Sequence, residues 1–83
     1  MIIQEGMIVK SIAGHDKDRF YLVVKISQDR AFIADGKRRS IDSQKPKNLK
    51  HLRPTKVIVK VEDYKTDKSL RALLHSYNYS TKK

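Results

Sequence analysis

Two apolar runs on either side of a charged corner dominate the first third of this 83-residue chain. The runs at residues 7–12 and 20–27 are rich in β-branched and aromatic side chains, a composition typical of strands. Gly14 begins the corner, and glycine can reverse a chain tightly because it takes a positive φ without a Cβ clash. We therefore predict two strands joined by a bend at residues 14–19.

Side chains of a strand alternate between two faces, so the second strand divides into an inner and an outer set. The inner set is uniformly apolar and is expected in the core: Phe20, Leu22, Val24 and Ile26. Tyr21 belongs to the other set and lies beside the corner. It is either a half-buried strand residue or an outward platform on which a nucleic-acid base can stack.

A hairpin is expected in the middle of the chain. Residues 31–34 are apolar and predict a third strand. The Asp35-Gly36 pair that follows is typical of a type I′ turn, which needs positive φ at both central positions. The chain then returns as a fourth strand at residues 37–41, with Ile41 directed inward and either Arg38 or Arg39 outward.

The next segment is polar and is expected to be a loop at residues 42–48, where Pro46 cannot donate to a central ladder. Residues 49–52 predict a short strand or a helical turn, and residues 53–55 break the chain again. Alternating valines predict a last strand at residues 57–61. Several short strands linked by tight turns favour a mostly-β fold, either a small antiparallel barrel or a sandwich.

The period of the apolar residues changes near the C-terminus. Four of them fall on one face of a helix: Leu70, Leu73, Leu74 and Tyr77. We predict an α-helix at residues 66–78, with Thr66 or Asp67 as its N-cap and Asn78 as its stop. Because so short a helix is marginal alone, we expect its leucines to dock on a barrel at residues 1–62, forming a single domain. The alternative is that the helix binds a partner's groove.

Charge is the strongest compositional feature: 19 Lys and Arg against 9 Asp and Glu give a net charge of +10. Such a chain attracts polyanions, and nucleic acid is the commonest polyanion in a cell. One acid, Asp42, lies within the segment 37–60. The cations of that segment are Lys37, Arg38, Arg39, Lys45, Lys47, Lys50, Arg53, Lys56 and Lys60. Phosphates neutralise such groups through charge-assisted hydrogen bonds and release counterions. The alternative is a solvated, lysine-rich loop that aids solubility.

The unit of two strands and a corner resembles a KOW motif, a short element built around one glycine in ribosomal and transcription-elongation proteins. The matching positions are Gly6, the alternating run at 7–12, Gly14, Asp16 and Lys17. The family often has glycine directly after this lysine, whereas this chain has Asp18. Aspartate enters the left-handed region more readily than most residues, so the turn can be kept, although its shape can differ.

Beyond the motif, the chain is similar to the small KOW-containing proteins related to large-subunit ribosomal proteins. Those proteins have an Ala-Asp-Gly hairpin and a later Lys-His-Leu segment, matched here by residues 34–36 and 50–52. The resemblance covers roughly residues 4–60. It implies an SH3-like barrel of five to six short antiparallel strands that binds structured RNA, most of all ribosomal RNA or the ribosome.

These features predict an RNA-binding module with two contact elements, the corner and the basic segment. The expected RNA-binding residues are Lys17, Arg19, Lys37, Arg38, Arg39, Lys45, Lys47, Lys50, His51 and Arg53, and Gly14 and Asp16 form the KOW turn. The alternative for the corner is a turn of internal ion pairs, because two aspartates flank its lysine and arginine. The alternative for the whole chain is a protein-interaction module, as in NusG-type KOW barrels, with the C-terminal helix or a strand edge as its surface.

Other function classes are not indicated by the sequence. It has no cysteine and its three histidines lie far apart, so we expect no disulfide, metal site or cofactor. We find neither a Gly-rich phosphate loop nor a catalytic set, and we expect no enzymatic activity. No apolar stretch approaches the roughly 20 residues of a membrane span. With no secretory apolar region at the N-terminus, we expect a cytoplasmic protein without a membrane partner.

Overall fold

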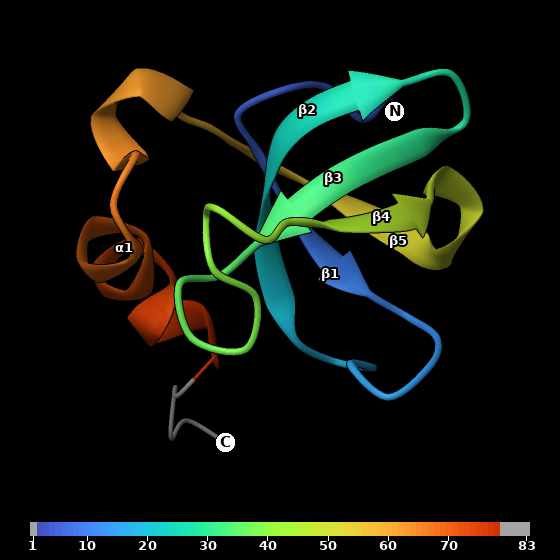
Figure 1. Cartoon of the computed structure of the whole chain (residues 1–83). Coiled ribbons are helices and arrows are strands. Elements are labelled where there is room, and N and C mark those ends of the chain that lie inside the picture. The colour runs from blue at the N-terminus through green and yellow to red at the C-terminus, as the bar shows by residue number, and fades with distance from the viewer. Residues whose placement is uncertain (1, 79–83) are drawn as a thin grey trace.

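Five antiparallel strands form one sheet in the computed structural model, which describes residues 2–78 (Figure 1). The strands are β1 (Met7–Ser11), β2 (Phe20–Ser27), β3 (Arg30–Ala34), β4 (Lys45–Asn48) and β5 (Leu52–Ile58). Their order across the sheet is β4-β3-β2-β1-β5, so each strand from β1 to β4 pairs with the next and β5 returns to β1. The predicted fold class, mostly β with a C-terminal helix, is confirmed.

The connection from β4 to β5 requires this sheet to curl. The two strands lie at opposite edges, yet only the 3₁₀-helix η1 (Leu49–His51) separates them along the chain. A 3₁₀-helix advances about 2 Å per residue. The outer strands of a flat sheet with this order would lie roughly 19 Å apart, at about 4.8 Å per strand spacing. The two edges therefore approach each other, which produces the small barrel-like sheet.

Both faces of the sheet are buried, because the helix α1 (Asp67–Asn78) covers the outside of the barrel (Figure 1). One cluster fills the interior and contains Met7, Val9, Tyr21, Val23, Ala31, Ile33 and Leu52. The other lies between the sheet and the helix and contains Ile8, Leu22, Ala34, Leu70 and Leu74. The helix thus docks its leucines on the barrel, and burying each leucine contributes about 1.5–3 kcal/mol of transfer free energy.

Two-sided burial corrects the predicted faces of β2. Tyr21 is 1% exposed, so an outward stacking platform at this position is excluded. A bulge between Val23 and Lys25 shifts the register of β2 against β3. Beyond that bulge Ile26 packs with the interior cluster, whereas Leu22 packs beneath the helix. Four residues were expected together in the core, but only Leu22 is fully buried. Phe20 and Val24 pack partly buried in the cluster beneath the helix, and Ile26 packs partly buried against the interior cluster.

The described ends of α1 are fixed by side chains. The Thr66 hydroxyl oxygen accepts a hydrogen bond from the Ser69 N–H at 3.1 Å, which identifies Thr66 as the N-cap. Asn78, the last described residue, accepts from the Phe20 N–H at 2.7 Å and donates to the Phe20 carbonyl at 3.1 Å. These two hydrogen bonds attach the C-terminal end of the described helix to the start of β2. No helix within residues 2–78 is long and apolar enough to cross a membrane.

The segment after β3 differs from its prediction. Residues 37–41 form no strand, because the Asp35 carboxylate accepts from the N–H groups of residues 37, 38 and 39 and the Asp67 carboxylate accepts from that of Ile41. β4 begins at Lys45, inside the predicted loop. Pro46 belongs to β4 because this is an edge strand, where a missing N–H is tolerated.

The second half of the barrel also differs in its bounds. Residues 49–51 form η1, the helical-turn alternative of the prediction. β5 begins at Leu52 and runs through the expected break, with Pro54 paired opposite Val9. The predicted last strand at 57–61 is therefore shifted toward the N-terminus, and the chain continues from residue 61 as a second 3₁₀-helix, η2 (Val61–Tyr64).

Candidate nucleic-acid interface

The corner between β1 and β2 is closed by short backbone hydrogen bonds. The Lys17 N–H donates to the Gly14 carbonyl at 3.2 Å, and the Asp18 N–H donates to the Ser11 carbonyl at 2.7 Å. Gly14 has φ of +83° and Asp18 has φ of +71°, so both lie in the left-handed region. The position where the family often has glycine thus takes a conformation that favours glycine, and aspartate accommodates it.

Asp16 anchors the corner to β4. Its carboxylate oxygen Oδ1 accepts from the Ser11 hydroxyl at 2.9 Å and from Lys47 Nζ at 2.8 Å. Oδ2 accepts from Lys45 Nζ at 3.4 Å, and Lys47 also donates to the Ala13 carbonyl at 2.8 Å. Asp16 and Lys47 are both buried. Asp16 therefore stabilises the fold, whereas the second aspartate of the corner, Asp18, is exposed and lies 3.8 Å from Lys10 Nζ.

The environment of Asp16 favours its charged form. Burial alone would raise the pKa of this carboxyl. Hydrogen bonds from Lys47 and Ser11, together with the positive charges of Lys47 and Lys45, outweigh burial and lower the pKa to about 2. The carboxylate is therefore ionised at neutral pH and holds the two lysines in place.

A second buried acid organises the segment after β3. Asp35 Oδ1 accepts hydrogen bonds from the backbone N–H groups of Lys37, Arg38 and Arg39, each at 2.9 Å. Its other oxygen, Oδ2, pairs with an Arg19 guanidinium nitrogen at 3.2 Å. We call residues 35–39 the basic turn. Because one carboxylate fixes three successive amides, the three side chains that follow it are presented to solvent together.

The basic turn and the corner enclose a hollow of about 300 Å³ between them. We call it the corner hollow, and it is lined by His15, Asp16, Tyr21, Arg38, Arg39 and Lys45. Both arginines are exposed, whereas Asp16 and Tyr21 are buried. An arginine guanidinium binds a phosphate in a bidentate manner, and a lysine ammonium acts as a point charge. The arrangement suits a phosphate group entering from solvent.

The structure divides the predicted RNA-binding residues into separate groups. Exposed positions are Lys17, Lys37, Arg38, Arg39, Lys50, His51 and Arg53. Lys45 is partly exposed and paired with Asp16. Lys47 is 7% exposed and bonded to Asp16, and the Arg19 side chain is 15% exposed and bonded to Asp35. Lys47 and Arg19, both predicted to contact RNA, are instead paired with Asp16 and Asp35 and stabilise the site.

The exposed cations form two groups along the chain. Lys50, His51 and Arg53 follow β4, whereas the basic turn precedes it, so a strand of four residues separates the two groups. That strand is roughly 13 Å long at about 3.3 Å per residue. None of the three lines the corner hollow. Both groups nevertheless lie beside the corner, since the His51 carbonyl accepts from the Ile12 N–H at 2.9 Å and Arg53 pairs opposite Lys10 at the end of β1.

Some residues of the site were not predicted. His15 lines the corner hollow, and the sequence gives no signal for it beyond its place in the corner. The role of Asp35 as a three-fold acceptor was also missed, although aspartate directly before glycine is a known turn former. Lys68 and Arg71 of α1 lie beside Lys37, and their spacing of three residues on one helical face was the available signal.

No protein-family model matches the chain, and no curated protein matches it at a significant level. The KOW resemblance and the RNA-binding residues therefore stay predictions.

Proposed function

We propose that this chain is an RNA-binding module that docks on structured RNA, ribosomal RNA above all, through the corner hollow and the basic turn. The observation that carries the proposal is the convergence of Arg38, Arg39 and Lys45 on the KOW-like corner, from a different part of the chain. Phosphate contacts would supply affinity, and the shape of the hollow would supply selectivity. A cytoplasmic location belongs to this proposal, because ribosomal RNA is its expected partner.

Two features of the site support this function over a merely solvated basic loop. First, the backbone of the basic turn is ordered by a buried carboxylate, so the positions from which its arginines project are set before any ligand arrives. A preorganised backbone loses less conformational entropy on binding. Second, the corner hollow has a fixed floor, because Asp16 and Tyr21 beneath it are buried. A flexible loop that served only solubility would need neither feature.

The test is the salt dependence of RNA binding. Fluorescence anisotropy with a labelled RNA hairpin should give an affinity that falls linearly on a log-log plot. The slope should be about −0.7 to −0.9 for each phosphate neutralised. The double variant Arg38→Gln/Arg39→Gln should flatten the slope. The matched control Lys56→Gln/Lys60→Gln removes the same charge from exposed positions outside the hollow and should change the slope less. Equal slopes for the two variants would contradict the proposed site.

A protein-interaction module is the second candidate, and one observation favours it. Ile58 of the edge strand β5 is 51% exposed, which is unusual for a large apolar side chain in a strand. The leucines of α1 are buried against the sheet, so the helix does not offer them to a partner. Partner capture that survives nuclease and high salt, and that is lost on Ile58→Lys, would favour this candidate over RNA.

A further inference from the structure

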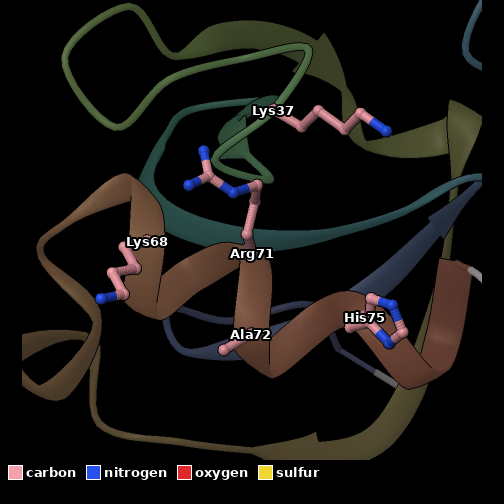
Figure 2. A pocket seen from close by; sticks show the side chains of 5 residues that line it. All are labelled: Lys37, Lys68, Arg71, Ala72 and His75. Atoms are coloured by element: carbon pink, nitrogen blue, oxygen red, sulfur yellow. The ribbon is translucent and has the colours of Figure 1, made fainter.

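A groove runs along α1 where the helix faces the basic turn (Figure 2). We call it the helix groove, and its volume is about 530 Å³. The residues that line it are Lys37, Lys68, Arg71, Ala72 and His75, with no acid among them. Figure 2 shows Arg71 projecting from the helix toward the segment that carries Lys37.

The spacing of the helical residues explains why they share this groove. Lys68, Arg71 and His75 are three and four residues apart, which places them on one face of an α-helix. Ala72 lies beside them with a side chain too small to fill the space (Figure 2). The opposite face of the helix carries Leu70, which is buried against the sheet. Docking the leucine face therefore presents the cationic face to solvent.

The fold does not neutralise the two cations at the centre of the groove. Within residues 2–78, neither Lys68 nor Arg71 forms an ion pair. Arg71 gives one guanidinium hydrogen bond to the Gly36 carbonyl at 2.9 Å, and a guanidinium has five N–H donors. The nearest acid in sequence, Asp67, uses its Oδ1 to accept from the Ile41 N–H at 2.7 Å. One N–H group of Arg71 therefore orients its side chain, while its other N–H groups can donate to an anion.

The helix groove and the corner hollow share the basic turn. The basic turn contributes Lys37 to the groove and the next two residues, Arg38 and Arg39, to the hollow. Two cationic depressions lined by successive residues of one turn suit a ligand with a repeated, closely spaced anion. A phosphodiester backbone has that chemistry, and a guanidinium matches each phosphate in a bidentate manner.

We infer that the helix groove binds a second phosphate of the RNA backbone whose first phosphate enters the corner hollow, with Lys68 and Arg71 as its contacts. This inference rests on the proposed function. An acidic peptide is the competing occupant, but it would not explain why the groove and the hollow share the basic turn.

The experiment measures anisotropy of the full chain with a labelled RNA hairpin over a series of salt concentrations. Lys68→Gln/Arg71→Gln should flatten the slope by about 0.7–0.9 for each phosphate that the variant no longer neutralises. Ala72→Glu should also weaken binding, because it adds a carboxylate to the groove without removing a cation. The matched controls are Lys60→Gln/Lys65→Gln and Gln4→Glu, which make the same charge changes at exposed positions that do not line the groove. They should leave the slope close to that of the wild type.

The outcomes separate this inference from the proposed function. A wild-type chain that binds the hairpin without salt dependence overturns both. A steep wild-type slope that Arg38→Gln/Arg39→Gln flattens and both groove variants leave unchanged overturns the groove alone. Groove variants that lose binding to a poly-glutamate peptide while keeping the RNA slope would assign the groove to a protein. Circular dichroism checks that each variant is folded, and Ala72→Glu replaces the double variant if Arg71 is needed for folding.

Discussion

Lys47 of β4 donates to the carboxylate of Asp16 at 2.8 Å, across 31 residues of chain, and both side chains are buried. This ion pair connects the corner to the edge strand that closes the barrel. A pair of this kind is costly to break, because removal of one partner leaves a buried charge without compensation. The pair therefore stabilises the shape of the corner.

Substitution of the two lysines that contact Asp16 should have unequal effects. Lys47→Met should lower the free energy of unfolding by up to about 3–5 kcal/mol, the usual effect of breaking a buried ion pair, because Asp16 would keep only the Ser11 hydroxyl and the longer Lys45 pair. Lys45→Met should cost less than about 1 kcal/mol, because the side chain of Lys45 is 29% exposed and its pair is longer, at 3.4 Å. Urea denaturation of both variants measures the difference. Equal losses of unfolding free energy in the two variants would show that the buried Lys47–Asp16 pair does not stabilise the corner.

Stability should fall in acid because of Asp16. The pKa of its carboxyl is lowered from 3.8 to about 2 in the folded state, so the unfolded chain takes up its proton first as the pH falls. The stabilisation is complete above about pH 4 and is lost between about pH 4 and pH 2, with a total of about 2 kcal/mol. Denaturation at a series of pH values measures it. Asp16→Asn should reduce this pH dependence, and an unchanged profile would contradict the assignment.

Removal of a negative charge at Asp35 should weaken RNA binding. Asp35→Ala raises the net charge of a cationic protein by one, which by charge alone favours a polyanion. It also removes the acceptor of three amides of the basic turn, so Arg38 and Arg39 lose their fixed positions. Asp63→Ala makes the same charge change at an exposed position and serves as the control. We expect a higher Kd for Asp35→Ala and an equal or lower Kd for Asp63→Ala.

Stronger binding by both variants would mean that charge dominates and that the order of the turn does not matter. Asp35→Asn keeps an acceptor oxygen while removing the ionic pair with Arg19. The Kd of Asp35→Asn for RNA should lie between those of the wild type and Asp35→Ala. This variant also keeps the comparison informative if the alanine variant is unstable.

Asp18→Gly should leave the protein as stable as the wild type or stabilise it. Asp18 has φ of +71°, a conformation that costs most non-glycine residues about 1–2 kcal/mol. Its ion pair with Lys10 is long, at 3.8 Å, and exposed, so its loss costs little. Thermal unfolding measures the effect. A clear drop in Tm would show that the Asp18 side chain has a structural role that its contacts do not reveal.

The sequence predicted those elements that local periodicity determines. The first two strands and the helix follow from alternating and helical spacing of apolar residues, and Gly14 marks the bend between the strands. The burial of Tyr21 was not predictable from β2 alone, because it depends on the curling of the sheet, which brings Met7 of β1 and Leu52 of β5 into the same interior cluster, while the helix covers the opposite face. Period alone does not tell a strand buried on one face from a strand buried on both.

The sequence predicted which cations the candidate site contains, but not which of them are exposed and which are paired within the fold. Arg38 and Arg39 stand out by charge. Lys47 belongs to the same basic segment, and nothing local separates it from them, since its partner Asp16 lies far away in the chain. The basic turn was predicted as a strand because the Asp-Gly signal indicates a hairpin. The side chain of Asp35 instead bonds the amides that a fourth strand would have used.

The most direct test of the account maps the contact surface by amide chemical shifts of the ¹⁵N-labelled chain during titration with an RNA hairpin. We predict that the largest shifts lie at residues 15–17 and 37–39, with smaller ones at residues 71–72 and little change in the edge strand β5. Shifts confined to η1 and β5, or no shifts at an RNA concentration that saturates a basic protein, would contradict the assignment of the corner hollow as the RNA site.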